Sequence, residues 1–256
     1  MPFGVSQAPA LFQRLMNLCL QGYLFERVLV FLDDILVFSS CFDQHLMHLN
    51  SVFERLRAAD LKLHPRKCEF GLDKLAYLGN IVSREGIAPD PRKIEVVKTW
   101  PEPTKLKELR SFLGFAGFYR RYVQDFAKIA AEFGDLLQKD STWKWTENHA
   151  IAFNKLKAAL CQSALLPHAD MSKPFRVTTD ASEKAIAYIL SQQDDKGFWK
   201  PVLFAGRSLK TAERRYRVME LELLALVSAI REFRHYLAGN HFEVETDHYS
   251  LKYLES

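Results

Sequence analysis

The chain has 256 residues, of which 48% are hydrophobic and 26% charged, and its formal net charge is +4. This composition is typical of a globular protein, and the length allows two or more domains. The net charge is too small to indicate which kind of partner the protein binds. No apolar run reaches membrane-spanning length and no secretion signal is present, so we expect an intracellular protein, cytoplasmic or nuclear, without a membrane partner. The scattered cysteines predict free thiols and no zinc site; they are Cys19, Cys41, Cys68 and Cys161.

An apolar run at residues 28–39 is interrupted by two adjacent carboxylates, Asp33 and Asp34. Its β-branched and aromatic residues predict a β-hairpin with the acidic pair at or beside the turn, after a helix at residues 8–23. An ordinary turn would explain the pair, since Asp tolerates turn conformations. Two carboxylates near a packed core would however repel each other, and a hard divalent ion such as Mg²⁺ would neutralise them. The residues alone leave both interpretations open.

The middle of the chain combines short strands with several helices. Asp43 is expected to cap a helix at residues 43–59, and Thr146 is expected to cap a later one. Short strands are expected at residues 61–83, followed by a break at 86–91. The remaining periodic patterns predict helices at residues 91–100, 106–123, 126–138 and 148–160.

Basic residues are concentrated between Lys105 and Lys128, where six Lys or Arg residues stand against two acidic ones. Such a local excess is suited to contact with a polyanion, although solvated basic faces are common. The aromatic residues of the same stretch are better explained as core residues than as platforms for stacking bases.

The last region predicts three antiparallel strands, a long helix and a further strand, which is an α+β pattern. Asp180 ends the first of these strands, Glu222 lies one turn inside the helix, and Asp247 ends the last strand. If the two strands are neighbours, the three acids can converge and hold two divalent ions that activate water. Acids are also common at strand ends and in the first turns of helices, so the spacing alone does not establish a site. The expected elements are residues 175–179, 184–192, 199–208, 218–237 and 242–246.

The sequence resembles the reverse transcriptase–ribonuclease H region of gypsy-type LTR retrotransposon Pol polyproteins, which are related to retroviral polymerases. The matching motifs follow the family's order over essentially the whole chain, which no single short motif could imitate. They are MPFGVSQAPALFQ at residues 1–13, FLDD at 31–34, KCEFG at 67–71, YLG at 77–79, ELRSFLG at 108–114, YRRY at 119–122, TDAS at 179–182, RHYL at 234–237 and TDH at 246–248.

The resemblance implies a multidomain α+β chain that is truncated at both ends. It assigns residues 1–88 to the C-terminal part of the polymerase fingers and palm and 89–140 to a helical thumb. It assigns residues 141–170 to a connection segment and 171–256 to an incomplete ribonuclease H-like α/β domain. The implied activities are RNA-directed DNA synthesis and hydrolysis of RNA in RNA–DNA hybrids. The expected partners are an RNA–DNA hybrid, a template–primer duplex and dNTPs. A second copy of the chain or other Pol domains are also expected as protein partners.

The resemblance also assigns roles to the acidic residues. Asp33 and Asp34 match two metal-binding acids of the polymerase, while Asp180, Glu222 and Asp247 match acids of the ribonuclease H. Two Mg²⁺ or Mn²⁺ ions are then expected in each active site. The thumb of such enzymes grips template–primer, and this implies phosphate contacts for Lys105, Lys107, Arg110, Arg120 and Arg121.

Parts of the family's pattern fall outside this sequence. The first metal-binding Asp of the polymerase and most of the fingers belong upstream, so we expect no polymerase activity from these residues alone. Tyr188 stands where the family has a small residue, and an inward-pointing side chain there could overpack the second strand. The alternative to an enzyme is a decayed or repurposed remnant that acts as a nucleic-acid-binding or interaction module.

Overall fold

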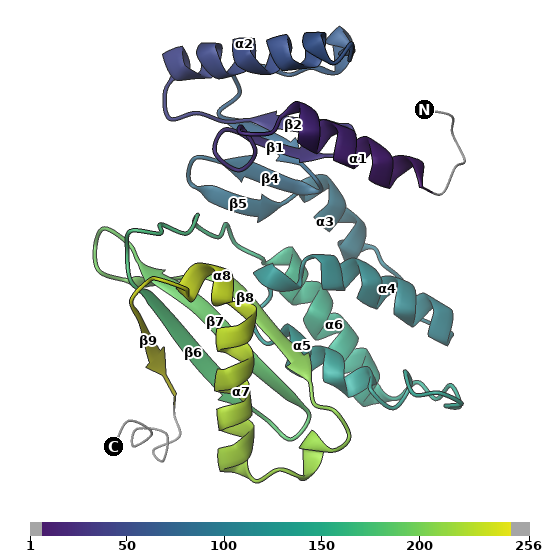
Figure 1. Ribbon diagram of the computed structural model, residues 1–256. Helices are drawn as coiled ribbons and strands as arrows, with labels where there is room; N and C mark the ends of the chain where they lie inside the picture. Colours follow the sequence, from purple (N-terminus) through teal and green to yellow (C-terminus); the bar gives the residue numbers. More distant parts are fainter. Residues whose placement is uncertain (1–6, 247–256) are drawn as a thin grey trace. The chain divides into compact units, whose positions relative to one another are not determined.

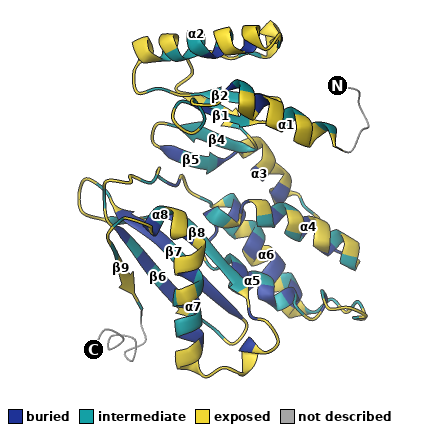
Figure 2. Cartoon of the chain, in the orientation of Figure 1, coloured by how far each residue is buried: buried dark blue, intermediate teal, exposed yellow. Residues whose placement is uncertain are grey.

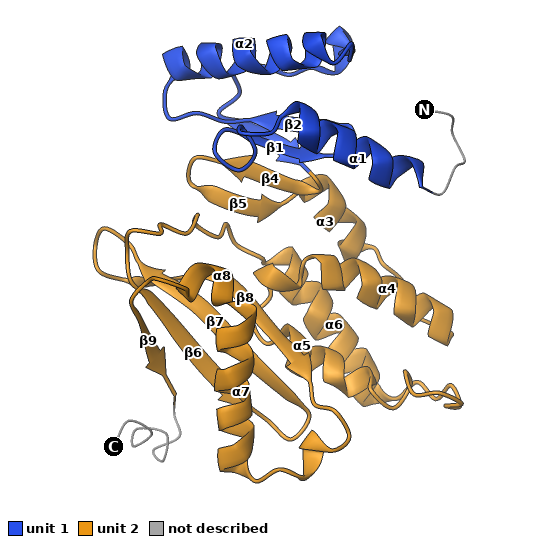
Figure 3. Cartoon of the chain, viewed as in Figure 1, with its two compact units in different colours: residues 1–77 blue, residues 78–256 orange. Residues whose placement is uncertain are grey.

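The computed structural model describes residues 7–246 and divides the chain into two compact units, residues 1–77 and 78–256 (Figure 3). Each unit has its own hydrophobic core. Within residues 7–246, no helix is long and apolar enough to cross a membrane.

The first unit packs two helices against a β-hairpin. Its core is formed by Met16 of the first helix and Leu20 just after it, Val28 of the hairpin, and Val52 and Leu56 of the second helix. Much of the surface of both helices remains exposed (Figure 2). The elements are α1 (Ala8–Cys19), β1 (Val28–Phe31), β2 (Asp34–Val37), α2 (Phe42–Ala58), a 3₁₀ turn η1 (Pro65–Lys67) and β3 (Lys74–Tyr77).

The expected cap of α2 is wrong by two residues. Cys41 is the N-cap residue, its backbone is extended, and it makes no side-chain capping bond. Asp43 lies inside the first turn, where its negative charge still interacts favourably with the helix dipole.

The second unit begins with a hairpin and a helical layer. A core of aromatic and aliphatic side chains, including Phe112, Phe133 and Phe153, joins the helices. Thr146 is the N-cap residue of α6, as expected. The elements are β4 (Asn80–Ser83), β5 (Gly86–Pro89), α3 (Pro91–Lys98), α4 (Leu106–Phe118), η2 (Arg120–Tyr122), α5 (Phe126–Ala130), η3 (Ala131–Phe133) and α6 (Glu147–Cys161).

The expected break at residues 86–91 is wrong, because β5 occupies most of this stretch. Ile87 exchanges two backbone hydrogen bonds with Leu166, with N···O distances of 2.8 and 2.9 Å. Gly86 makes this pairing possible, since a Cβ atom there would lie 2.0 Å from the Leu166 carbonyl oxygen. The α-helices expected at 106–123 and 126–138 are shorter in the structure. α4 ends at Phe118 and α5 at Ala130, and a 3₁₀ turn follows each of them.

The C-terminal part of the second unit is a four-stranded sheet in the order β8-β7-β6-β9. β6, β7 and β8 are antiparallel neighbours, and β9 pairs in parallel with β6. Helix α7 packs on one face of the sheet and α5 on the other (Figure 1). The elements are β6 (Phe175–Ala181), β7 (Ala185–Gln193), β8 (Trp199–Ser208), η4 (Glu213–Arg215), α7 (Val218–Glu232), α8 (Arg234–Leu237) and β9 (Phe242–Glu245).

Tyr188 points inward from β7 and is accommodated rather than overpacked. Its side chain is 2% exposed and lies edge-on to Phe233, with ring centroids 5.4 Å apart. The hydroxyl donates a hydrogen bond to the carboxylate of Glu232, the last residue of α7. Burial raises the pKa of the Tyr188 hydroxyl, and the bond to Glu232 raises it further.

Replacing Tyr188 by Phe should lower the free energy of unfolding by about 1–2 kcal/mol, because a buried hydrogen bond to a charged group is lost. The fold stabilises the neutral hydroxyl, so this difference is present below about pH 10 and should disappear as the pH rises above it. Urea titrations of both proteins at several pH values measure the effect. Tyr236→Phe is the matched control, since within residues 7–246 no hydrogen bond of the Tyr236 hydroxyl is seen. Equal stability of wild type and Tyr188→Phe at neutral pH would show that the hydrogen bond between Tyr188 and Glu232 does not stabilise the fold.

Candidate functional site

The β1–β2 hairpin carries Asp33 and Asp34 at its tip, as the sequence predicts. Phe31 pairs with Asp34, so Leu32 and Asp33 form the two-residue turn. Both carboxylates are exposed. Leu32 has a φ angle of 51°, a left-handed conformation that is unfavourable for a branched side chain.

Gln13 of α1 holds this strained turn in place. Its side-chain oxygen accepts a hydrogen bond from the Leu32 N–H at 2.7 Å, and its side-chain nitrogen donates to the Val30 carbonyl at 3.2 Å. The same nitrogen is 2.9 Å from Asn17 Oδ1, one turn along the helix. Gln13 therefore fixes the backbone that presents Asp33. Sequence reasoning gave it no role; the available signal was a glutamine next to the apolar stripe of a helix that faces the hairpin.

A cavity of about 660 Å³ lies beside the two acids within the first unit. Asp33 and Asp34 contribute to its wall together with apolar residues of both helices, among them Phe12 and Val52. Tyr77 also lines the cavity; burial raises the pKa of its hydroxyl, and the negative charge of Asp34 raises it further. The acids thus stand at a hollow large enough for a ligand group.

The second set of acids is built on the four-stranded sheet. Asp180 is the sixth residue of β6, and its side chain is 54% exposed. Glu222 of α7 is 4% exposed, and its Oε1 accepts a hydrogen bond from the Ala181 N–H at 3.2 Å. The strand and helix therefore bring Asp180 and Glu222 to the same end of β6. Asp247, the third predicted acid, lies outside the described residues.

A lysine already neutralises Asp180. Lys128 of α5 forms an ion pair with the Asp180 carboxylate, and its Nζ also lies 3.7 Å from Asp125 Oδ1. In the stretch from residue 7 to 246, no three His, Cys, Asp or Glu side chains are grouped so that they could hold a metal ion. The donor set that the structure describes at this end of β6 does not fit a divalent ion as it stands.

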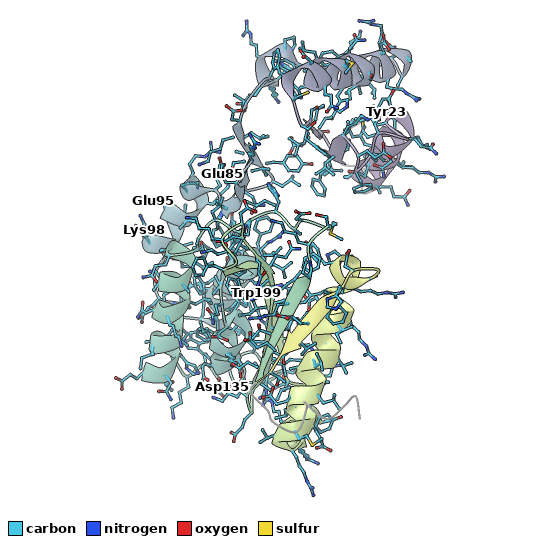
Figure 4. The ribbon with its side chains drawn as sticks, turned by 90° about the vertical axis from the view of Figure 1, so that its left-hand side faces the viewer. Tyr23, Glu85, Glu95, Lys98, Asp135 and Trp199 are labelled. Atoms are coloured by element: carbon cyan, nitrogen blue, oxygen red, sulfur yellow. The ribbon has the colours of Figure 1, made fainter. Side chains whose placement is uncertain are left out.

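Residues on the face of β6 that carries Asp180 also form a charged network. Arg176 makes ion pairs with Glu243 and Glu245 of β9, and its guanidinium lies 4.0 Å from the ring centroid of Trp199. Trp199 is labelled at the start of β8 in Figure 4. Thr178 donates a hydrogen bond to Glu245 at 2.8 Å. These contacts tie β9 and β8 to β6 on the face that carries Asp180.

Three of the five basic residues predicted to contact phosphate already interact with another side chain of the chain. Lys105 lies 3.2 Å from Glu108, Arg120 lies 3.8 Å from Glu232, and half-buried Arg121 packs on the ring of Tyr122. Lys107 and Arg110 are exposed on α4, and no ion pair of either is seen within residues 7–246. Of the five predicted residues, these two are the ones for which the described part of the chain shows no ion pair or ring contact.

Two family models match the chain, one over the acid-bearing hairpin and one over most of the four-stranded sheet. The family model described as "Reverse transcriptase (RNA-dependent DNA polymerase)" matches residues 1–82. The model described as "RNase H-like domain found in reverse transcriptase" matches residues 145–244. The chain belongs to the reverse transcriptase and RNase H-like region of LTR retrotransposon Pol polyproteins, which confirms the resemblance seen in the sequence.

Curated relatives support this membership. The chain is 41% identical to the Retrovirus-related Pol polyprotein from transposon 297 and 37% identical to that from transposon 412, both of Drosophila melanogaster. It is 34% identical to the Transposon Tf2-3 polyprotein of Schizosaccharomyces pombe. All or nearly all of the chain is matched, 100%, 100% and 98%, but it spans only 24%, 21% and 19% of the length of these relatives.

Solved structures share the fold. The foamy viral protease-reverse transcriptase in complex with dsDNA matches 98% of the chain with a TM-score of 0.81 at 24% identity, over 52% of the viral chain. The same viral protein in complex with RNA/DNA hybrid matches 96% of the chain with a TM-score of 0.78 at 24% identity, over 33% of its length. Reverse transcriptases generally use divalent metal ions. The question for the acids of this chain is therefore whether they could hold such an ion.

Replacing Gln13 by Leu should loosen the hairpin turn, because the Leu32 amide loses its acceptor while α1 keeps a good helix former. Hydrogen exchange of the Leu32 amide should accelerate by tenfold or more, and the first unit should lose about 1–2 kcal/mol of stability. Gln21→Leu, at an exposed glutamine just after α1, is the control and should change neither value. Unchanged exchange of the Leu32 amide in the Gln13 variant would show that the turn keeps its conformation without the Gln13 side chain.

Proposed function

We propose that the chain provides part of the polymerase site and the RNase H-like domain of an RNA-directed DNA polymerase and ribonuclease H. The observation that carries this proposal is the β1–β2 hairpin, whose turn presents Asp33 and Asp34 beside a cavity. In this proposal the two acids are polymerase metal ligands, and Asp180, Glu222 and Asp247 are the ribonuclease H acids. The substrates are template–primer duplex with dNTPs and the RNA–DNA hybrid, with Mg²⁺ or Mn²⁺ as the metal.

The 256 residues alone should not synthesise DNA. Two carboxylates cannot replace the three metal-binding acids of the family, and the first of the three belongs upstream of this sequence. Primer extension with the purified chain, Mg²⁺ and dNTPs should stay at background, while a polypeptide that adds the upstream residues should extend the primer. Extension by the 256-residue chain itself would overturn the proposed division of the site.

The exposed face of α4 is proposed to contact the duplex. Lys107 and Arg110 lie on this face, and it continues to Gly114 and Gly117. A Cβ atom added to either glycine would meet nothing within 4 Å, so the described residues leave this side of the helix open. Two cations next to a surface without side chains suit the close approach of a phosphate backbone.

Replacing Lys107 and Arg110 together by Ala should weaken hybrid binding and lower the slope of log K against log salt by about 2, since two phosphate contacts are lost. Fluorescence anisotropy with a labelled RNA–DNA hybrid at several salt concentrations measures the slope. The control is Lys93→Ala with Lys155→Ala, which removes the same charge from exposed positions on α3 and α6. An equal loss in both double variants would indicate a general charge effect and no defined face.

The second candidate function is a module that binds nucleic acid without cleaving it. The ion pair between Lys128 and Asp180 favours it, because the lysine neutralises an acid that a nuclease would need for metal. Hybrid cleavage with Mg²⁺ or Mn²⁺ distinguishes the two functions. Cleavage that is lost in Asp180→Asn supports the nuclease, whereas salt-sensitive binding without cleavage supports the module. Cleavage that is unchanged in Asp180→Asn would come from a contaminating nuclease.

A further inference from the structure

The contact between α5 and the sheet places a cation on an acid of the RNase H-like domain. α5 packs on the sheet face opposite α7, and its Ala127 is buried together with Ala131 and Ala185. Gly206 of β8 allows the close approach, since a Cβ atom there would lie 3.2 Å from the Cβ of Ala127 and 2.5 Å from a backbone oxygen. Small residues therefore set α5 tightly against β7 and β8.

Lys128 follows Ala127 directly, so the same packing fixes where its side chain can reach. The side chain is 24% exposed and its ammonium group pairs with Asp180. A second ion pair, between Lys184 and Glu132 at 2.8 Å, supports the contact. The backbone that carries the lysine thus belongs to a packed interface, which holds its ammonium group within reach of Asp180.

We propose that Lys128 is an internal cation that occupies the position beside Asp180 where a divalent metal ion would bind, and that it keeps this carboxylate closed to metal. The proposal rests on the proposed assignment of Asp180 to the ribonuclease H acids. A divalent ion at Asp180 would have to break the ion pair and then tolerate a positive charge a few ångström away. Removal of the positive charge should therefore increase metal affinity.

The structure also offers the lysine a second partner. Asp125, three residues earlier, has its Oδ1 3.7 Å from the Lys128 Nζ. Rotation of the flexible lysine side chain would transfer the ammonium group fully to Asp125 without unfolding α5. Lys128 would then stop competing with metal at Asp180, so the closure is reversible.

Metal binding by the full 256-residue chain tests the proposal. Mn²⁺ is titrated into the wild type and Lys128→Met, and the free ion is measured by electron paramagnetic resonance. Methionine keeps an unbranched apolar stem and removes the charge, so Lys128→Met should bind Mn²⁺ about tenfold more tightly at one site. The gain should vanish when Asp180→Asn is added to the same variant.

Two further variants separate charge from packing. Lys128→Arg retains the cation and should bind Mn²⁺ as weakly as the wild type. Lys184→Met removes a neighbouring ion pair of the same interface but leaves Lys128 on Asp180, so it should also resemble the wild type. A gain in Lys184→Met equal to that in Lys128→Met would overturn the proposal, because loosening of the interface would then explain both.

The remaining outcomes distinguish this inference from the proposed function. If the wild type already binds Mn²⁺ through Asp180 as tightly as Lys128→Met, the metal site is real and Lys128 does not compete. If neither protein binds Mn²⁺ at Asp180, both the competition and the proposed ribonuclease H site in this chain are wrong. A gain that survives Asp180→Asn places the metal elsewhere and also overturns the inference.

Discussion

The alternation of side chains along β6 determines which face of the C-terminal sheet packs against α7 and which face carries Asp180. Phe175, Val177 and Thr179 are buried, and the first two belong to the core beneath α7. The residues between them, ending with Asp180, point to the opposite face. A slip of one residue in the pairing of β6 would expose the aromatic core residue and bury the acid. The hydrophobic core and the position of the carboxylate are therefore specified by the same register.

Much of the architecture follows from local sequence patterns. The run at 28–39 predicts the hairpin with Asp33 and Asp34 at or beside its turn, and the last region predicts three antiparallel strands, a helix and a further strand. The structure contains all of these elements. Thr146 marks the start of α6 as expected. These features depend on residues close to one another in the sequence, where periodicity, turn chemistry and capping act directly. The family motifs imply roles for the acids, which spacing alone leaves open.

The contacts that complete the candidate sites could not be predicted in this way. Gln13 reaches Leu32 from another element, and Lys128 of α5 reaches Asp180 of β6 on the sheet face that α5 covers. Gln13 and Lys128 fit the local pattern of their own segments, and no periodicity in the sequence indicates which residue each of them contacts. Gly86, Pro89 and Pro91 are typical of turns and therefore predict a break at residues 86–91, yet Gly86 is required by the approach of a distant carbonyl group. Sequence patterns give the elements, and pairing between distant elements gives the sites their surroundings.

The pairing of Ile87 with Leu166 has a consequence for how the chain folds during its synthesis. On a ribosome, residues 78–165 emerge before Leu166, the partner of Ile87, is available. The free edge of β5 therefore stays unpaired during that interval. Contacts between residues so distant in sequence form late, because the intervening loop must close first. The second unit should therefore become protected from proteases only after Leu166 has left the ribosomal tunnel, although the helices before it are complete.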